Sequence, residues 1–194
     1  MSASLVGSEM CIRDRFYGYI TEGLYQVDDF NYDASTQTYT LKDGVPYHGD
    51  KGQIRPGMWK FKNLTGDDNV IDENDKTVIG NAQPKFYGGL NNSFTYKGFD
   101  LSIFLTFSYG NEVLNATKLV TSKVGSLNYN ALDVMNSSNR WMTINTEGEK
   151  VTDPGELAVL NAGKTVAVYH DAQQGDNYIH SWAVEDASYL KLSN

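Results

Sequence analysis

The chain has 194 residues, of which 40% are hydrophobic and 21% are charged. This composition allows one sizeable core and excludes a disordered chain. Lys and Arg number 16 against 24 Asp and Glu, so the formal net charge is −8. Such a surface repels phosphate groups, which argues against binding to nucleic acid.

Aromatic and turn-forming residues dominate the composition, with 13 Tyr, 8 Phe and 18 Gly against only 4 Pro. This usage favours strands joined by turns and therefore an all-β fold. The single cysteine, Cys11, cannot form an internal disulfide, and no Cys/His set has the spacing of a zinc site. The sequence contains no stretch of about 18 apolar residues, so it predicts no transmembrane helix. This criterion does not detect membrane strands, because apolar and polar residues alternate along them.

Residues 1–15 share no periodicity with the rest of the chain and lack the apolar core of a secretory signal. Residues 4–15 resemble translated sequencing-adaptor read-through, and a natural flexible N-terminus is the alternative. We expect residues 1–15 to be an artefactual or disordered tail.

Residues 16–60 mix aromatic residues, glycine and polar residues in the manner of short strands and turns. Turns are predicted at Lys42-Asp43-Gly44 and at Arg55-Pro56-Gly57.

An acidic loop follows at residues 63–75, with oxygen-bearing side chains on both sides of an apolar pair. Calcium takes about six to eight oxygen ligands, which a loop of this kind can supply. The loop departs from an EF-hand, since its sixth residue is not Gly and its twelfth is not Glu. The predicted calcium ligands are Asp67, Asp72 and Asp75, and a solvated acidic turn is the alternative.

Residues 84–110 hold two runs of period-two alternation around Lys97-Gly98, which predicts a hairpin with a two-residue turn. This turn places Tyr96 opposite Phe99, so the apolar faces of the two strands coincide. One face of the second strand carries only apolar and aromatic side chains: Phe99, Leu101, Ile103, Leu105, Phe107 and Tyr109.

The length of this hairpin leaves two classes of protein open. A strand of about twelve residues rises about 40 Å and, when tilted, spans the hydrocarbon of a bilayer. Apolar-out alternation with terminal aromatics is typical of outer-membrane barrels, in which the short Lys97-Gly98 turn would be periplasmic. A long hairpin in a soluble sandwich, with its apolar face against a second sheet, fits the pattern equally well.

Residues 111–180 are polar and rich in Gly and Asn, which predicts an extracellular loop or lid. Helical patches are possible at residues 112–123 and 129–141. Alternation returns from residue 181 and stops inside an expected strand at Asn194, so we expect the chain to be truncated at its C-terminus.

No constellation in the sequence supports catalysis, and we predict that the chain is not an enzyme. His48, His170 and His180 lie apart from any nucleophile elbow or zinc-binding pair, and we expect them on the surface. Adjacent carboxylates such as Asp28 and Asp29 would point to opposite strand faces.

Residues 16–194 resemble, in order, the C-terminal part of a SusC/RagA family TonB-dependent outer-membrane receptor. The segments that carry the resemblance are 16–19 (FYGY), 21–26 (TEGLYQ), 56–64 (PGMWKFKNL), 65–67, 70–72, 74–81 (NDKTVIGN), 84–86, Gly89, Phe94, 96–102 (YKGFDLS), 109–111 and 184–192 (VEDASYLKL). The family's acidic loop usually reads Asp-x-Asn-Gly-Asp-Gly, and this chain departs from it at Asn63, at Thr65 and by an extra residue within Asp68-Asn69.

The resemblance implies an all-β fold: a partial transmembrane antiparallel β-barrel, seen as an open sheet of long hairpins with long extracellular loops. It implies import of glycan or peptide fragments across the cell outer membrane, with a SusD-like surface lipoprotein, outer-membrane lipid and TonB as partners. The plug and the TonB-contacting segment of the family are not in this sequence. Tyr109, Trp141 and Trp182 are candidates for stacking on sugars, although membrane interfaces or loop cores explain them equally well.

A second hypothesis is a soluble secreted β-sandwich that binds carbohydrate and is stabilised by calcium in the acidic loop. The two hypotheses differ in what covers the apolar face of the hairpin, which is lipid in the first and a second sheet in the other.

Overall fold

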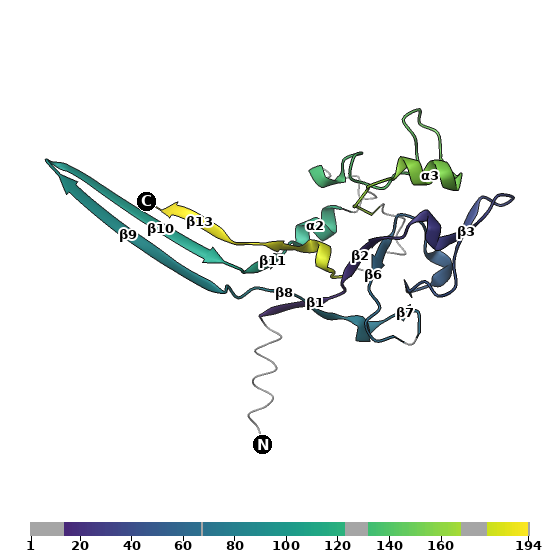
Figure 1. Ribbon diagram of the computed structural model, residues 1–194, viewed down its shortest axis with the longest axis horizontal. Helices are drawn as coiled ribbons and strands as arrows, with labels where there is room; N and C mark the ends of the chain where they lie inside the picture. The colour runs from purple at the N-terminus through teal and green to yellow at the C-terminus, as the bar shows by residue number, and fades with distance from the viewer. Residues whose placement is uncertain (1–13, 67, 123–131, 168–177, 194) are drawn as a thin grey trace, which may run out of the picture.

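The computed structural model describes residues 14–66, 68–122, 132–167 and 178–193. They form two regions, a long three-stranded blade (residues 86–109 and 189–193) and a body made of the other described residues (Figure 1). Most of the elements are strands and the helices are short, which confirms the all-β class. No helix among these residues is long and apolar enough to cross a membrane.

The blade consists of β9 (Phe86–Tyr96), β10 (Phe99–Tyr109) and β13 (Tyr189–Ser193), in the antiparallel order β13-β10-β9. The β9–β10 turn has positive φ at both central residues, 46° at Lys97 and 87° at Gly98. This is the geometry of a type I′ turn, whose twist matches that of the flanking strands, and Gly tolerates it without strain. The predicted hairpin and its turn are confirmed.

The register of the blade places most of the apolar side chains of all three strands on one face. Tyr96 lies opposite Phe99 and Leu90 opposite Leu105, as predicted, and Leu192 of β13 flanks Leu105 on its other side. The sheet is open, as expected, because within the described residues its order ends at β9 and β13.

Two short ladders form the part of the body that adjoins the blade. β1 (Arg15–Gly18) pairs with β8 (Thr77–Asn81), and β11 (Glu112–Leu114) pairs with β12 (Val184–Asp186). The side chain of Glu112 accepts a 2.7 Å hydrogen bond from the backbone N–H of Asn81, which ties the two ladders together. Both strands that leave the base of the hairpin are thereby anchored.

The body contains three further strand pairs and several short helices. Its remaining elements are β2 (Thr21–Leu24) with β6 (Trp59–Phe61), β3 (Phe30–Asp33) with β4 (Thr38–Leu41), β5 (Tyr47–His48) with β7 (Val70–Ile71), α2 (Ala116–Thr121), α3 (Pro154–Leu160), and the 3-10 turns η1 (Val27–Asp29), η2 (Lys51–Gln53), η3 (Glu73–Asp75), η4 (Asp133–Met135) and η6 (Ser181–Ala183).

Three clusters of buried side chains hold the body together. The clusters are Leu24, Val27, Trp141, Val151, Leu157 and Ala167; Tyr25, Phe30, Leu41, Ile54 and Met58; and Tyr19, Phe61 and Ile71. The Trp141 ring lies on Gly57, where an added Cβ would stand 2.4 Å from it. Gly57 also has φ of 86°, so both the turn and the close approach require glycine.

The helical patches expected within residues 111–180 are mostly wrong. Residues 112–114 form β11, and only Ala116–Thr121 are α-helical in the first patch. In the described part of the second patch, only Asp133–Met135 form a 3-10 turn. The described segments of this region also supply Trp141, Leu157 and Val166 to the buried interior, so they pack into the body. Their extracellular position stays a prediction.

Candidate functional site

The apolar face of the blade is exposed over most of its length, and only Ile103, Leu105 and Phe107 of the central strand are half-buried. The exposed fraction is 56% for Leu90, 55% for Leu101 and 69% for Leu192. Among the residues that the structure describes, no second sheet covers these side chains. An exposed apolar surface of this extent indicates a site of contact with lipid or with an apolar surface of another protein.

The opposite face of the blade is mostly polar and is internally hydrogen-bonded. Thr95 donates a 2.7 Å hydrogen bond to Asp100 across the β9–β10 ladder, and the Ser93 and Ser102 hydroxyls lie 3.4 Å apart. The Phe104 ring leans over Gly89, which has no side chain to occupy that space. The two faces therefore differ in chemistry as those of a sheet between lipid and water do.

The dimensions of the blade match a membrane-spanning hairpin. β9 and β10 have 11 residues each, against about five or six in a typical soluble strand. At a rise of about 3.4 Å per residue such a strand is about 37 Å long, and a tilt of about 45° reduces its span to about 26 Å. The apolar band of outer-membrane barrels is about 25 Å tall.

In the acidic loop, Asp75 is buried and its carboxylate organises the backbone around it. Oδ1 accepts hydrogen bonds from the Leu64 and Thr65 N–H groups at 2.7 and 2.9 Å and from the Thr65 hydroxyl at 2.9 Å, and Oδ2 accepts one from the Asp72 N–H at 2.8 Å. Burial opposes ionisation of this carboxyl, but the hydrogen bonds outweigh it and lower the pKa. Asp75 therefore closes the loop through hydrogen bonds from three backbone N–H groups and the Thr65 hydroxyl.

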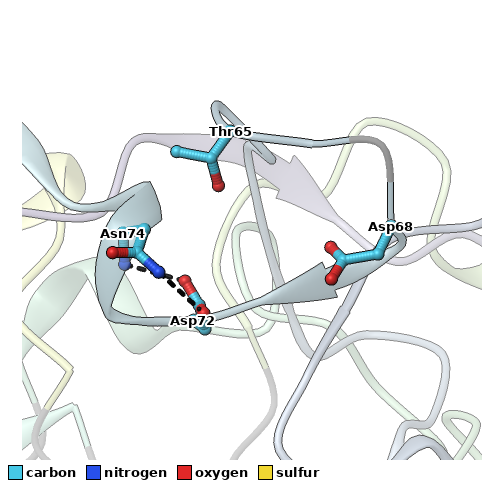
Figure 2. Close-up of a pocket in the computed structure, with 4 residues that line it drawn as sticks. All are labelled: Thr65, Asp68, Asp72 and Asn74. Atoms are coloured by element: carbon cyan, nitrogen blue, oxygen red, sulfur yellow. Dashed lines mark hydrogen bonds between the residues drawn. The ribbon is translucent and has the colours of Figure 1, made fainter.

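Asp72 is differently placed, at the start of η3 and at the edge of an open hollow. Figure 2 shows Thr65, Asp68, Asp72 and Asn74 around this hollow. Asp72 accepts hydrogen bonds from the Asn74 backbone at 2.7 Å and from its side chain at 3.0 Å. Asp67 lies outside the described residues.

Within the described part of the chain, no group of three or more His, Cys, Asp or Glu side chains is arranged to hold a metal ion. Asp72 and Asp75 share the loop, yet Asp75 uses both oxygens on protein donors. Calcium binding by Asp67, Asp72 and Asp75 stays a prediction.

The expectation of surface histidines is wrong for His48 and His180, which are only 6% and 4% exposed. Both pack against Phe61, with ring centroids 5.0 and 5.4 Å away. Within the described residues, the buried Nδ1 of His48 has no hydrogen-bond partner, whereas Nδ1 of His180 lies 2.9 Å from the Thr21 hydroxyl. His170 lies outside the described residues.

Burial controls the charge of both histidines. It lowers the pKa of His48 to about 4, and burial, reinforced by the positive charge of Lys118 and by His48, lowers the pKa of His180 to about 4. Both rings are therefore neutral at pH 7, and they act as packing groups between β6, β5 and the segment before η6.

The three aromatic candidates for sugar stacking lie in different surroundings. Trp141 is only 1% exposed, which settles its role as a core residue. Lys118 lies over the Trp182 ring at 4.2 Å, and Trp59 packs on the same indole at 5.0 Å. Tyr109, 52% exposed at the base of the blade, stacks on Phe86 at 5.0 Å.

No family model matches the chain. Two curated proteins of Formosa agariphila are similar to it. TonB-dependent receptor P3 is 31% identical over 179 residues, which cover 92% of this chain and 14% of the receptor. TonB-dependent receptor P39 is 31% identical over 134 residues, which cover 58% of this chain and 13% of the receptor.

The chain spans 13–14% of the length of the curated relatives it matches. The aligned region with P3 covers most of the chain, so it includes both body and blade. The similarity supports the interpretation that the chain corresponds to a part of a TonB-dependent receptor.

Proposed function

We propose that the chain is part of an outer-membrane TonB-dependent transporter, with the blade forming part of a transmembrane barrel wall. In this proposal the chain serves transport and not catalysis. The exposed apolar face of an 11-residue hairpin is the observation that carries it. The similarity to two TonB-dependent receptors supports the same assignment.

Lipid accounts for the exposed face better than a second protein sheet does. A soluble sandwich buries the inner faces of both of its sheets, whereas Leu101, Leu190 and Leu192 are each more than half exposed. The hydrophobic effect makes such a surface unstable in water but stable in a bilayer. The polar side of the blade would then face the lumen of the barrel.

The turn defines an orientation for this barrel wall. Short turns of outer-membrane barrels are periplasmic and long loops are extracellular. The Lys97-Gly98 turn lies at the tip of the blade, and the body lies at the other end of the strands (Figure 1). The body would therefore stand on the extracellular side, where a ligand arrives.

The finer assignment includes a cargo and a partner. We propose glycan or peptide fragments as the imported ligands, a SusD-like lipoprotein as the partner at the extracellular body, and TonB as the source of energy through a part of the receptor outside this chain. The resemblance of residues 16–194 to the SusC/RagA family supports this assignment.

The test compares the full chain in aqueous buffer and in detergent micelles. Circular dichroism measures its β-structure, and light scattering measures its particle size. We expect aggregation in buffer and monodisperse β-structure in detergent, because micelles cover the apolar face of the blade.

A monodisperse β-structured chain in buffer would contradict the proposal and favour the soluble carbohydrate-binding module. A variant with Leu90, Leu101 and Leu190 changed to Ser provides the control. It should lose its tendency to aggregate while keeping the buried clusters of the body.

A further inference from the structure

A pocket of about 260 Å³ lies in the body, between the end of the β3–β4 hairpin, the Arg55-Pro56 turn and residues 143–157. Three segments that are distant in sequence therefore meet around it. β3 and α3 lie at the end of the molecule far from the tip of the blade (Figure 1). In the orientation proposed above, this end faces the outside of the cell.

Both charged side chains that line the pocket are cationic, Arg55 and Lys150. The chain as a whole carries a net charge of −8. The pocket differs from it in sign, because two cations and no carboxylate line it. An anionic group would be attracted there by Coulomb forces that the walls of the pocket strengthen.

The two cations are held in different ways. One guanidinium nitrogen of Arg55 donates hydrogen bonds to the carbonyl oxygens of Gly52 and Ile54 at 2.7 and 2.8 Å, which fixes the group in place. Lys150 is exposed and forms no ion pair within the described residues. Its backbone bridges to Ile144 in a short antiparallel turn, which places the side chain at the rim.

The remaining wall combines apolar surface with hydroxyl groups. Leu157 is buried and contributes an apolar floor. The Tyr39 ring forms one side, held by a 2.8 Å hydrogen bond from its hydroxyl to the carbonyl oxygen of Thr152. Gln37, which also lines the pocket, has φ of 53°, a left-handed conformation that non-glycine residues adopt at a cost.

We propose that this pocket binds a single sugar ring that carries an anionic group, either a carboxylate or a sulfate. The volume lies just below the usual range of about 300–1,000 Å³ for small-molecule pockets, which suits one ring rather than a chain. Arg55 and Lys150 would bind the anion, Tyr39 and Leu157 would contact the apolar side of the ring, and the polar rim would bind its hydroxyls. The choice of a sugar rests on the proposed glycan import, whereas the choice of an anion rests on the pocket itself.

The experiment titrates the full chain in detergent micelles with galacturonate, galactose 6-sulfate and galactose, and follows binding by ligand-detected NMR. We expect both anionic probes, or one of them, to bind at least about tenfold more tightly than galactose. Preference for galacturonate would indicate a carboxylate ligand, and preference for galactose 6-sulfate a sulfate ligand. Equal binding of all three probes would overturn the proposal.

Lys150→Gln should weaken binding of the preferred anion about tenfold, and Lys150→Glu should abolish it. Lys62→Gln, a change of the same charge at an exposed lysine that does not line the pocket, is the matched control. Because Lys150 is exposed, these variants should keep the circular dichroism spectrum of the parent chain. Equal effects of Lys150→Gln and Lys62→Gln would place the anion elsewhere and overturn the proposal.

The outcome is separable from that of the transport proposal. A chain that is monodisperse in buffer and binds galacturonate through Lys150 would retain this inference while contradicting transport. A chain that is monodisperse only in detergent and binds the three probes equally would support transport and contradict the anionic-sugar pocket.

Discussion

The blade and the body are stabilised in different ways. The blade has regular ladders between its strands, with Leu90, Leu101 and Leu192 exposed on one face. The body has short, irregular strand pairs but buries three clusters of side chains, with Trp141 and Tyr25 almost completely inaccessible.

This difference shows where each region finds its hydrophobic stabilisation. The body buries its apolar side chains against one another, so most of its driving force comes from within the chain. The blade joins its three strands by backbone hydrogen bonds but leaves its apolar face, and within the described residues the outer edges of β9 and β13, to its surroundings. We therefore expect the two regions to respond separately to mutations and to solvent.

The largest expected effect of a single substitution comes from a charge on the apolar face of the blade. Leu90→Arg should lower the free energy of unfolding in detergent micelles by about 2–4 kcal/mol, because the charge would enter the apolar phase. Asn91→Arg, one residue along β9 and on the other face, should cost less than about 1 kcal/mol. Urea unfolding followed by circular dichroism measures both, and equal losses would contradict the assignment of the two faces.

A clash in the body should have the next largest effect. Gly57→Ala places a Cβ 2.4 Å from the Trp141 ring at a residue with φ of 86°, and we expect a loss of about 2–3 kcal/mol. Gly44→Ala shares the positive φ, 83°, but meets no atom within 4 Å, so its loss should be about 1 kcal/mol.

Thermal unfolding followed by near-ultraviolet circular dichroism measures the loss of stability in Gly57→Ala and in Gly44→Ala. Hydrogen exchange of the β9–β10 amides should be unchanged in both variants. If Gly57→Ala also exposed those amides, the body and the blade would unfold together.

Acid should weaken the body through its buried histidines. Unfolded histidine has a pKa of about 6.5, while burial lowers the pKa of His48 and His180 to about 4. Between these two pH values the unfolded chain binds protons that the folded chain does not. Stability is therefore greatest above pH 6.5 and falls towards pH 4, by about 1.4 kcal/mol per pH unit for each histidine.

Replacing one histidine separates its contribution to the pH dependence of stability from that of the other. His48→Leu keeps an apolar group among Phe61 and Tyr178 and should reduce this slope by about half. Urea unfolding at several pH values between 4 and 7 measures it. A slope unchanged by the replacement would show that His48 does not titrate with unfolding.

The smallest expected effect concerns calcium at the acidic loop. If the loop binds calcium, the ion should raise stability by about 1 kcal/mol when its concentration exceeds the dissociation constant several-fold. Asp72→Asn should remove this gain, whereas Asp28→Asn, the same change at an exposed carboxylate in η1, should keep it. Thermal unfolding with calcium and with a chelator provides the test, and identical curves for the parent chain would exclude a stabilising ion.

The hairpin could be predicted residue by residue because its strands and its turn are specified by residues that are neighbours in the sequence. The period-two alternation identifies the faces, and Lys97-Gly98 specifies a turn that fixes the register, so Tyr96 lies opposite Phe99 as expected. The predicted turn at Arg55-Pro56-Gly57 is confirmed on the same basis. The need for glycine under Trp141 was not visible, since the two residues are distant in sequence.

In the acidic loop, one role of Asp75 could be predicted from the local sequence and another could not. The spacing of Asp72 and Asp75 is that of a capping box, and the structure contains this box at η3. This local signal could have identified Asp75 as a structural residue. Its contacts with Leu64 and Thr65 depend on how the loop folds back, which the spacing alone does not specify.

Alternation and turn chemistry act between neighbouring residues, so the all-β class, the long hairpin, its register and its two chemically different faces could all be predicted from the sequence. The burial of His48 and His180, the core position of Trp141 and the pocket that Arg55 and Lys150 both line became apparent only in the folded chain. These features join segments far apart in the chain, and the packing that brings such segments together has no period in the sequence.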